Sequence, residues 1–211
     1  MLMIFKQIIG FLGKSLSFFF PSVLLKSLRA SLNFFYTGFI SRRFYKIGKN
    51  STIAFKLLGL HGANHISIGY NTFIGRNTRL TMWNEQATEP GIIIGNNCNI
   101  GDFAHITALK GIIIGDNLLS GTNLLISDNS HGGFDLEELK MNPIRRDLTS
   151  KGPVNIGNNV WIGNNVCVLQ GVTIGDGAVI GANSVVTKDI PSFSVAVGVP
   201  ARVVKKINFA K

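Results

Sequence analysis

Residues 94–131 read IGNNCN (94–99), IGDFAH (100–105), ITALKG (106–111), IGDNLL (114–119), SGTNLL (120–125) and ISDNSH (126–131). After an interruption, the same pattern resumes as IGNNVW (156–161), IGNNVC (162–167), VLQGVT (168–173), IGDGAV (174–179), IGANSV (180–185) and VTKDIP (186–191). Eleven of these twelve units open with Ile or Val, and the remaining unit opens with Ser120. A fixed short period indicates stacked structural units, none of which can bury its apolar face alone.

The six-residue period favours one short strand and one tight corner in each unit. The first residue, and often the fifth, is small or aliphatic, as expected for strand positions that face a core. Gly, Asn and Asp occupy many of positions two to four, where a tight corner needs a positive φ angle or a local side-chain hydrogen bond. Three such units in each turn predict a triangular all-β solenoid.

The Ile-Gly-Asn-Asn and Ile-Gly-Asp strings strongly resemble those of the hexapeptide-repeat acyltransferases, and the resemblance covers about residues 94–207. It implies a left-handed parallel β-helix. The handedness comes from the resemblance alone, because right-handed crossovers are the general expectation. We therefore expect a β-helix domain over residues 49–191, with a loop excursion at 132–153. Residues 192–211 are expected to form a tail with a short C-terminal helix.

Residues 1–48 differ from the rest of the chain. Large apolar residues recur there at three- and four-residue steps, first from Leu2 to Phe19 and again from Leu24 to Phe39. This spacing predicts two amphipathic helices, joined at the string Ser-Phe-Phe-Phe-Pro. The segment also holds nine of the fifteen Phe residues.

Charge is distributed unevenly along the chain, whose formal net charge is +10. Residues 1–84 contain eleven Lys or Arg and no Asp or Glu. A basic, Phe-rich amphipathic pair fits the surface of an anionic membrane, although its uncharged runs are shorter than the ~20 residues of a membrane span. The alternative role is to cap the open end of the β-helix or to pack against another subunit. No nucleic-acid-binding motif accompanies the basic residues.

Two features predict where the protein resides. Cys98 and Cys167 lie several coils apart in the predicted solenoid, which argues against a disulfide and favours a reducing compartment. No small-residue cleavage site follows an apolar core in the N-terminal segment, so a secretory signal is not expected. We predict a cytoplasmic protein that lies peripherally at the inner face of the cytoplasmic membrane.

The excursion at 132–153 begins directly after His131, the last residue of an unbroken run of units. A loop of about twenty residues inside a compact repeat is usually functional. Imidazole exchanges protons near neutral pH, which suits it to general-base catalysis. In the sugar O-acetyltransferases of the resembled family, a His just before this loop deprotonates the acceptor hydroxyl. The resemblance therefore makes His131 the candidate catalytic base.

Two other polar residues each have two candidate roles. Asp128 would act in the site, by orienting the His131 imidazole or binding sugar hydroxyls, or it would only cap a corner of the solenoid. His105 ends a repeat unit where related enzymes carry a polar residue that touches the acceptor, and a corner residue without chemistry fits equally well. The four His residues of the chain form no recognisable zinc-binding pattern, so no metal is predicted.

The resemblance also implies a coenzyme A site in the last coils. The string Asn158–Gly163 closely matches a family signature in which the indole, here Trp161, packs near the thiol arm and the acceptor. Exposed backbone amides would bind the pantetheine arm, and cations would bind the nucleotide phosphates. The further residues carried over on this basis are Gly163, Asn164, Gly181, Ala182, Thr187, Lys188, Arg202 and Lys205.

The resemblance implies the activity of an acetyl-CoA-dependent O-acetyltransferase. It also implies a homotrimer with the donor site between neighbouring subunits. The expected acceptor is a sugar hydroxyl of a bacterial surface polysaccharide or a lipid-linked glycan, acetylated by direct transfer. One alternative is a small soluble acceptor, such as a free sugar, an antibiotic or a nucleotide-sugar amine. The other alternative is a β-helix scaffold without catalysis.

Overall fold

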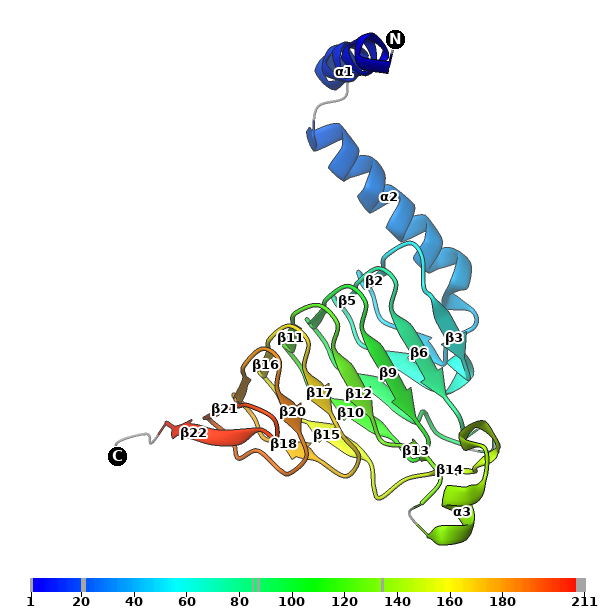
Figure 1. Cartoon of the computed structure of the whole chain (residues 1–211), viewed down its shortest axis with the longest axis vertical. Helices are drawn as coiled ribbons and strands as arrows, with labels where there is room; N and C mark the ends of the chain where they lie inside the picture. Colours follow the sequence, from blue (N-terminus) through cyan, green and yellow to red (C-terminus); the bar gives the residue numbers. More distant parts are fainter. Residues whose placement is uncertain (1, 20–21, 85, 87, 134, 208–211) are drawn as a thin grey trace.

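The computed structural model describes residues 2–19, 22–84, 86, 88–133 and 135–207. Two N-terminal helices lead into a stack of coils, which ends in a C-terminal β-hairpin (Figure 1). The chain visits three sheets in rotation, and strands from successive coils pair in parallel. The mostly β architecture with parallel stacked repeats is confirmed.

The elements of each sheet follow one another along the stack. The first sheet contains β1 (Lys46–Ile47), β4 (Ile66–Ile68), β7 (Ile92–Ile94), β10 (Ile112–Ile114), β15 (Val154–Ile156) and β18 (Thr173–Ile174). The second contains β2 (Thr52–Ile53), β5 (Phe73–Ile74), β8 (Asn99–Ile100), β11 (Leu119–Ser120), β16 (Trp161–Ile162), β19 (Val179–Ile180), β21 (Ser194–Val197) and β22 (Arg202–Lys206). The third contains β3 (Gly59–His61), β6 (Arg79–Met82), β9 (His105–Ala108), β12 (Leu125–Ser127), β17 (Cys167–Val168) and β20 (Val185–Val186). A single 3-10 turn, η1 (Ala63–His65), connects β3 to β4 in the described chain.

The first residues of the repeat units form the core. In the first sheet, Ile68, Ile94, Ile114, Ile156 and Ile174 pair one above another in successive coils. Each of these side chains is at most 2% exposed. Burying an aliphatic side chain of this size contributes about 1.5–3 kcal/mol relative to leaving it in water. The resulting column of apolar contacts keeps the outward-facing residues of each coil in fixed register.

The corners explain why Asn and Gly recur in the repeat. Positive φ angles between 53° and 61° occur at Asn71, Asn77, Asn97, Asn117, Asn123, Asn159, Asn165 and Asn183. The Gly at position two has a different reason, because a Cβ atom on Gly95 would lie 2.5 Å from the carbonyl oxygen of Gly115 in the next coil. Asn therefore supplies the left-handed turn, and Gly permits the close approach of neighbouring coils.

α2 (Ser22–Ser41) closes the N-terminal end of the stack with its C-terminal half. The backbone N–H of Ile53 donates to the Thr37 hydroxyl at 2.8 Å, and that of Phe55 donates to the Asn33 side chain at 3.0 Å. Ile40 is buried against the first coil. These contacts satisfy amide groups that an open end would leave without partners. This half of α2 is thus a cap of the solenoid.

α1 (Leu2–Phe19) has different surroundings. Every side chain from Leu2 to Ser17 is exposed, and the helix lies beyond the end of α2 that is remote from the sheets (Figure 1). The two predicted N-terminal helices are confirmed, and their joint falls partly on residues 20–21, outside the described residues. Within the described ranges, no helix combines the length and apolar character that a membrane span requires.

The C-terminal segment forms a β-hairpin, so the predicted short helix is wrong for residues 194–206. β21 pairs in parallel with β19, and β22 turns back to pair with β21 in the antiparallel sense. The last coil leaves an open sheet edge of unpaired N–H and C=O groups, and Val195, Val203 and Val204 favour an extended backbone. Edge pairing therefore determines the local structure. Residues 208–211 lie outside the described chain.

The excursion folds into a structured unit that we call the flap, residues 130–149. It comprises β13 (Ser130–His131), α3 (Leu136–Lys140), the 3-10 turn η2 (Pro143–Arg145) and β14 (Leu148–Thr149). β13 and β14 pair in the antiparallel sense. The Arg146 guanidinium donates to the carbonyl groups of Leu139 and Met141, which ties the end of α3 to the hairpin.

Candidate active site

A cleft of about 500 Å³ crosses the outer surface of the third sheet and reaches the flap. We call it the histidine cleft, because His105 and His131, the two histidines that the sequence singled out, both line it. Arg79, Trp83 and Leu148 also belong to its lining. The fold thus brings together residues that are far apart in the sequence, on β6, β9 and the flap.

The flap hairpin holds His131 at the edge of this cleft. His131 lies opposite Leu148 in the β13–β14 pair, and the next residue, Gly132, has a φ angle of 77° that favours glycine. The N–H of Gly132 donates to the carbonyl group of Asp147 at 2.8 Å. The His131 side chain is exposed and has no hydrogen-bond partner among the described residues. Its imidazole is therefore available to accept a proton from a bound hydroxyl group.

Asp128 is fully buried. Its carboxylate accepts hydrogen bonds, each of 2.7 Å, from the backbone N–H groups of Leu109, Lys110 and Gly111. It also accepts one from the Asn129 side chain at 3.1 Å. These are the contacts of the corner-capping alternative, and within the described chain no hydrogen bond joins this carboxylate to His131. The Asp128 carboxylate thus holds the turn at 109–111, in the coil before the one from which the flap projects.

His105 lies next to Arg79 on adjacent strands, because β6 and β9 pair with these two residues in register. Partial burial lowers the pKa of His105, and the positive charge of Arg79 lowers it further. The neutral imidazole is therefore favoured near pH 7. A neutral imidazole can both donate and accept a hydrogen bond, as contact with a sugar hydroxyl requires.

A second cleft, of about 370 Å³, lies on the second sheet and the corner that follows it. We call it the tryptophan cleft, because Trp161 lines it and is 55% exposed. Its lining also includes four of the residues assigned to coenzyme A from the sequence: Gly163, Asn164, Gly181 and Ala182. Trp161 is on the second sheet, whereas His131 lies beside the third, so one copy of the chain keeps the two side chains in separate clefts.

A ladder of corner hydrogen bonds ends in the tryptophan cleft. At several other corners, the N–H at position three donates to an Asx side chain one coil further on, as Thr122 does to Asn164 at 2.9 Å. The equivalent position after Asn164 is Ala182, which has no side-chain acceptor. The N–H of Asn164 is consequently left without an acceptor among the described residues. An unpaired amide beside an exposed indole suits a ligand that carries amide carbonyl groups.

The residues assigned to phosphate binding fall into two groups. Arg202 and Lys205 are on β22, where Arg202 lies opposite Val197 and Lys205 opposite Val195. β21 lies beside β19, so this pair is near the tryptophan cleft. Thr187 and Lys188 follow β20 at the corner between the third and first sheets, and they line neither cleft of the single chain.

The sequence did not single out Arg79 or Trp83 of the histidine cleft. Arg79 and His105 are each the sixth residue of a repeat unit, and they pair on adjacent strands. The shared repeat position could therefore have pointed from His105 to Arg79. Trp83 follows β6 and precedes an irregular loop, where the six-residue period gives no information. Among the described residues, no group of three or more His, Cys, Asp or Glu side chains is arranged to hold a metal ion.

Comparisons with known proteins agree with this architecture. The family model described as bacterial transferase hexapeptide (six repeats) matches residues 153–188, and that for the hexapeptide repeat of succinyl-transferase matches residues 91–127. The chain is 37% identical over 147 residues to a putative lipopolysaccharide biosynthesis O-acetyl transferase, WbbJ, of Escherichia coli (strain K12). That match covers 68% of this chain and 72% of the relative.

Two further similarities involve galactoside acetyltransferases. The chain is 46% identical over 102 residues to galactoside O-acetyltransferase of Escherichia coli (strain K12), covering 46% of this chain and 45% of the relative. A solved structure of a galactoside acetyltransferase in complex with coenzyme A matches at 37% identity with a TM-score of 0.56. It covers 67% of this chain and 64% of that chain.

The repeated units, the two clefts and the extent of these similarities define the class of protein. The chain belongs to the hexapeptide-repeat acyltransferases.

Proposed function

We propose that the protein transfers an acetyl group from acetyl-CoA to a hydroxyl group of a sugar in a bacterial surface polysaccharide or a lipid-linked glycan. The pair of clefts carries the proposal. One offers an exposed imidazole among polar groups, and the other offers an indole beside an unpaired amide. The named activities of the relatives support acetyl as the transferred group and a sugar as the acceptor.

Acetyl-CoA binds in the tryptophan cleft in this proposal. The pantetheine arm runs along the corner that contains Gly163 and Gly181, both of which line the cleft. One of its amide carbonyls accepts from the N–H of Asn164, and the indole of Trp161 packs against the thiol arm. Arg202 and Lys205 supply positive charge for the nucleotide phosphates. The coenzyme A bound to the related galactoside acetyltransferase supports this choice of donor.

The acceptor binds in the histidine cleft, where its hydroxyl group meets His131. The imidazole removes the hydroxyl proton as the oxygen attacks the thioester carbonyl carbon, the carbon–sulfur bond breaks, and coenzyme A leaves as the thiol after taking up a proton. His105 positions the sugar through hydrogen bonds. General-base assistance of this kind contributes ~10²–10⁴-fold, and orientation of the two substrates supplies much of the rest.

The separation of the two clefts favours an assembly of identical chains. A thioester beside Trp161 meets a hydroxyl beside His131 if the second sheet of one copy faces the flap of another. A ring closed by threefold symmetry repeats such a contact three times without leaving open ends. We therefore propose a homotrimer in which each active site is shared by two neighbouring subunits.

The amphipathic character of α1 supports a location for the enzyme at a membrane surface. α1 has Lys6 and Lys14 on its polar side and exposes Phe5, Ile8 and Leu12 on the other. Such a helix lies in the interface of an anionic membrane with its apolar face among the lipid chains. We propose a peripheral location at the inner face of the cytoplasmic membrane, where lipid-linked glycans are within reach.

Mass spectrometry of surface glycans tests the proposed function. Glycans from cells that have the gene are expected to be heavier by about 42 Da per modified sugar than those from cells lacking it, because transfer replaces a hydroxyl hydrogen with an acetyl group. Complementation with a His131→Ala variant should leave the lighter glycan. Identical glycan spectra, together with acetylation of only free monosaccharides by the purified enzyme, would instead favour the small-acceptor alternative.

A further inference from the structure

Trp83 presents an indole in the histidine cleft that the proposed chemistry does not use. Its Nε1–H donates to the Thr107 hydroxyl at 3.0 Å, and its backbone N–H donates to the carbonyl group of Ala108 at 2.9 Å. The indole also lies against the His61 ring, with centroids 4.7 Å apart and planes at 36°. These contacts hold the ring while 43% of the residue's surface remains exposed. A fixed, exposed aromatic ring is a surface that the CH groups of a sugar ring can cover.

Arg79 provides a permanent positive charge in the same cleft. Its side chain is exposed, and the stem of that side chain lies beside Gly59 of the preceding coil. Among the residues that the structure describes, the lining of the histidine cleft contains no Asp or Glu. The lowered pKa of His105 keeps that neighbouring imidazole neutral near pH 7, so His105 does not duplicate the charge of Arg79.

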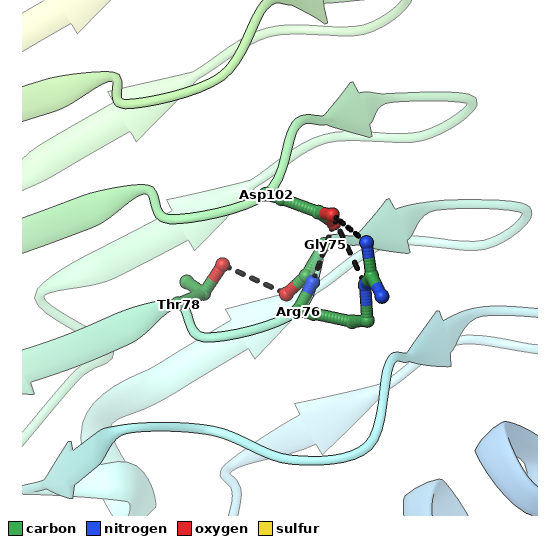
Figure 2. A network of polar contacts seen from close by, with 4 residues as sticks. All are labelled: Gly75, Arg76, Thr78 and Asp102. Carbon is green, nitrogen blue, oxygen red and sulfur yellow. Dashed lines mark hydrogen bonds and ion pairs between the residues drawn. The ribbon is translucent and has the colours of Figure 1, made fainter. Parts of the chain in front are cut away.

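Arg76, at the corner before Arg79, is an arginine with a structural role and provides a comparison for Arg79. Figure 2 shows its guanidinium directed at Asp102 of the next coil, to which it donates at 3.0 Å and 2.7 Å. Partial burial works against ionisation of Asp102, but hydrogen bonds from Arg76 outweigh it and lower the pKa of the carboxyl group. Arg79 has no such carboxylate partner among the described residues. Its charge is therefore left for a ligand.

We propose that Trp83 and Arg79 form an acceptor subsite that selects an acidic sugar. The apolar face of the pyranose ring rests on the indole, and its carboxylate pairs with the Arg79 guanidinium. His131 then meets a hydroxyl group of the same sugar or of its neighbour in the glycan. The inference rests on the proposed function in one respect, because it takes the histidine cleft as the acceptor site.

Two pairs of acceptors that differ only at C6, where one member has a carboxylate and the other a hydroxymethyl group, test the subsite. The 4-nitrophenyl β-glucuronide is compared with the β-glucoside, and the β-galacturonide with the β-galactoside, for the rate of acetylation and, separately, for binding by ligand-observed NMR. The wild-type enzyme should favour the acidic member of at least one pair by about tenfold or more in both measurements, as a charge-assisted contact predicts. Arg79→Gln should abolish the preference, so that the acidic and neutral members of each pair bind and react alike.

Matched variants separate local contacts from general effects. Arg76→Gln removes the same charge from the chain and should keep the preference. Trp83→Leu should weaken the binding of acidic and neutral glycosides alike, by about tenfold. Trp83→Phe retains a flat ring and should keep most of the affinity. Thermal unfolding of each variant confirms that it is folded.

The possible results distinguish the subsite from the reaction. If the acidic glycosides bind through Arg79 but are not acetylated, the result would support the subsite and contradict the proposed acetyl transfer. Acetylation without a charge preference, or with a preference that Arg79→Gln leaves intact, would overturn the subsite and leave the transfer standing. Failure of all four glycosides to bind would also overturn the subsite.

Discussion

Replacement of His131 by Ala is expected to lower the turnover number for sugar acetylation by about a thousandfold, within the ~10²–10⁴-fold range of general-base catalysis. The imidazole is exposed at the edge of the histidine cleft, with no hydrogen-bond partner in the described chain that its loss would disturb. The affinity for coenzyme A should stay the same, because Trp161 and the adjacent corner lie in a separate cleft. Steady-state kinetics and isothermal titration calorimetry measure the two quantities.

Two controls distinguish proton transfer from a structural effect. Leu148→Ala alters the cross-strand partner of His131 in the same hairpin. It should lower the turnover number by less than about tenfold, because it removes packing contacts and leaves the base in place. Added imidazole should restore part of the turnover of the His131→Ala enzyme, because the small base can occupy the vacated space. Near-normal turnover of the His131→Ala enzyme would remove His131 as the base.

Removal of α1 is expected to release the protein from vesicles that contain phosphatidylglycerol. The variant should begin at Ser22, because the C-terminal half of α2 caps the first coil through Asn33 and Thr37 and has to be retained. A double substitution, Ile8→Gln with Leu12→Gln, should weaken vesicle binding by about a hundredfold. This follows from about 3 kcal/mol for two apolar side chains that no longer enter the interface. Vesicle co-sedimentation measures the change.

The polar side of α1 offers a matched control. Gly13→Gln with Ser17→Gln introduces the same side chains on the side of the helix that carries Lys6, and it should bind vesicles as the wild type does. A Cβ on Gly13 would meet no other atom within 4 Å, so the control introduces no clash. If the truncated protein binds vesicles normally but has a smaller mass in solution, then α1 packs against another copy and the membrane proposal is wrong.

The regular part of the fold could be predicted because its period is a direct consequence of its geometry. Ile at position one faces the core, Asn at position four takes the left-handed turn, and an interruption of the period has to project from the stack. Residues that the sequence singled out accordingly line the two clefts, with His131 and His105 in one and Trp161 with its glycine corners in the other. The left-handed winding remains an expectation that the family resemblance supplies.

The remaining features depend on contacts between coils, which the period does not describe. Asp128 had two candidate roles, and only the position of turn 109–111 reveals three amide groups directed at its carboxylate. The tail was expected to be helical because its sequence does not disclose that an open sheet edge lies beside it. Trp83 lies outside the regular units, and its place in the histidine cleft follows from the stacking of β6 on β9.

Mixing two inactive variants tests most directly whether His131 and Trp161 of different subunits form one active site. His131→Ala lacks the base, and Trp161→Ala lacks the indole beside the donor. When the two chains are co-expressed in equal amounts and assemble at random, about one quarter of the shared sites in a threefold ring contain both intact residues. The proposed mechanism predicts about a quarter of wild-type acetylation from the mixture and almost none from either variant alone. A mixture no more active than its components would contradict it.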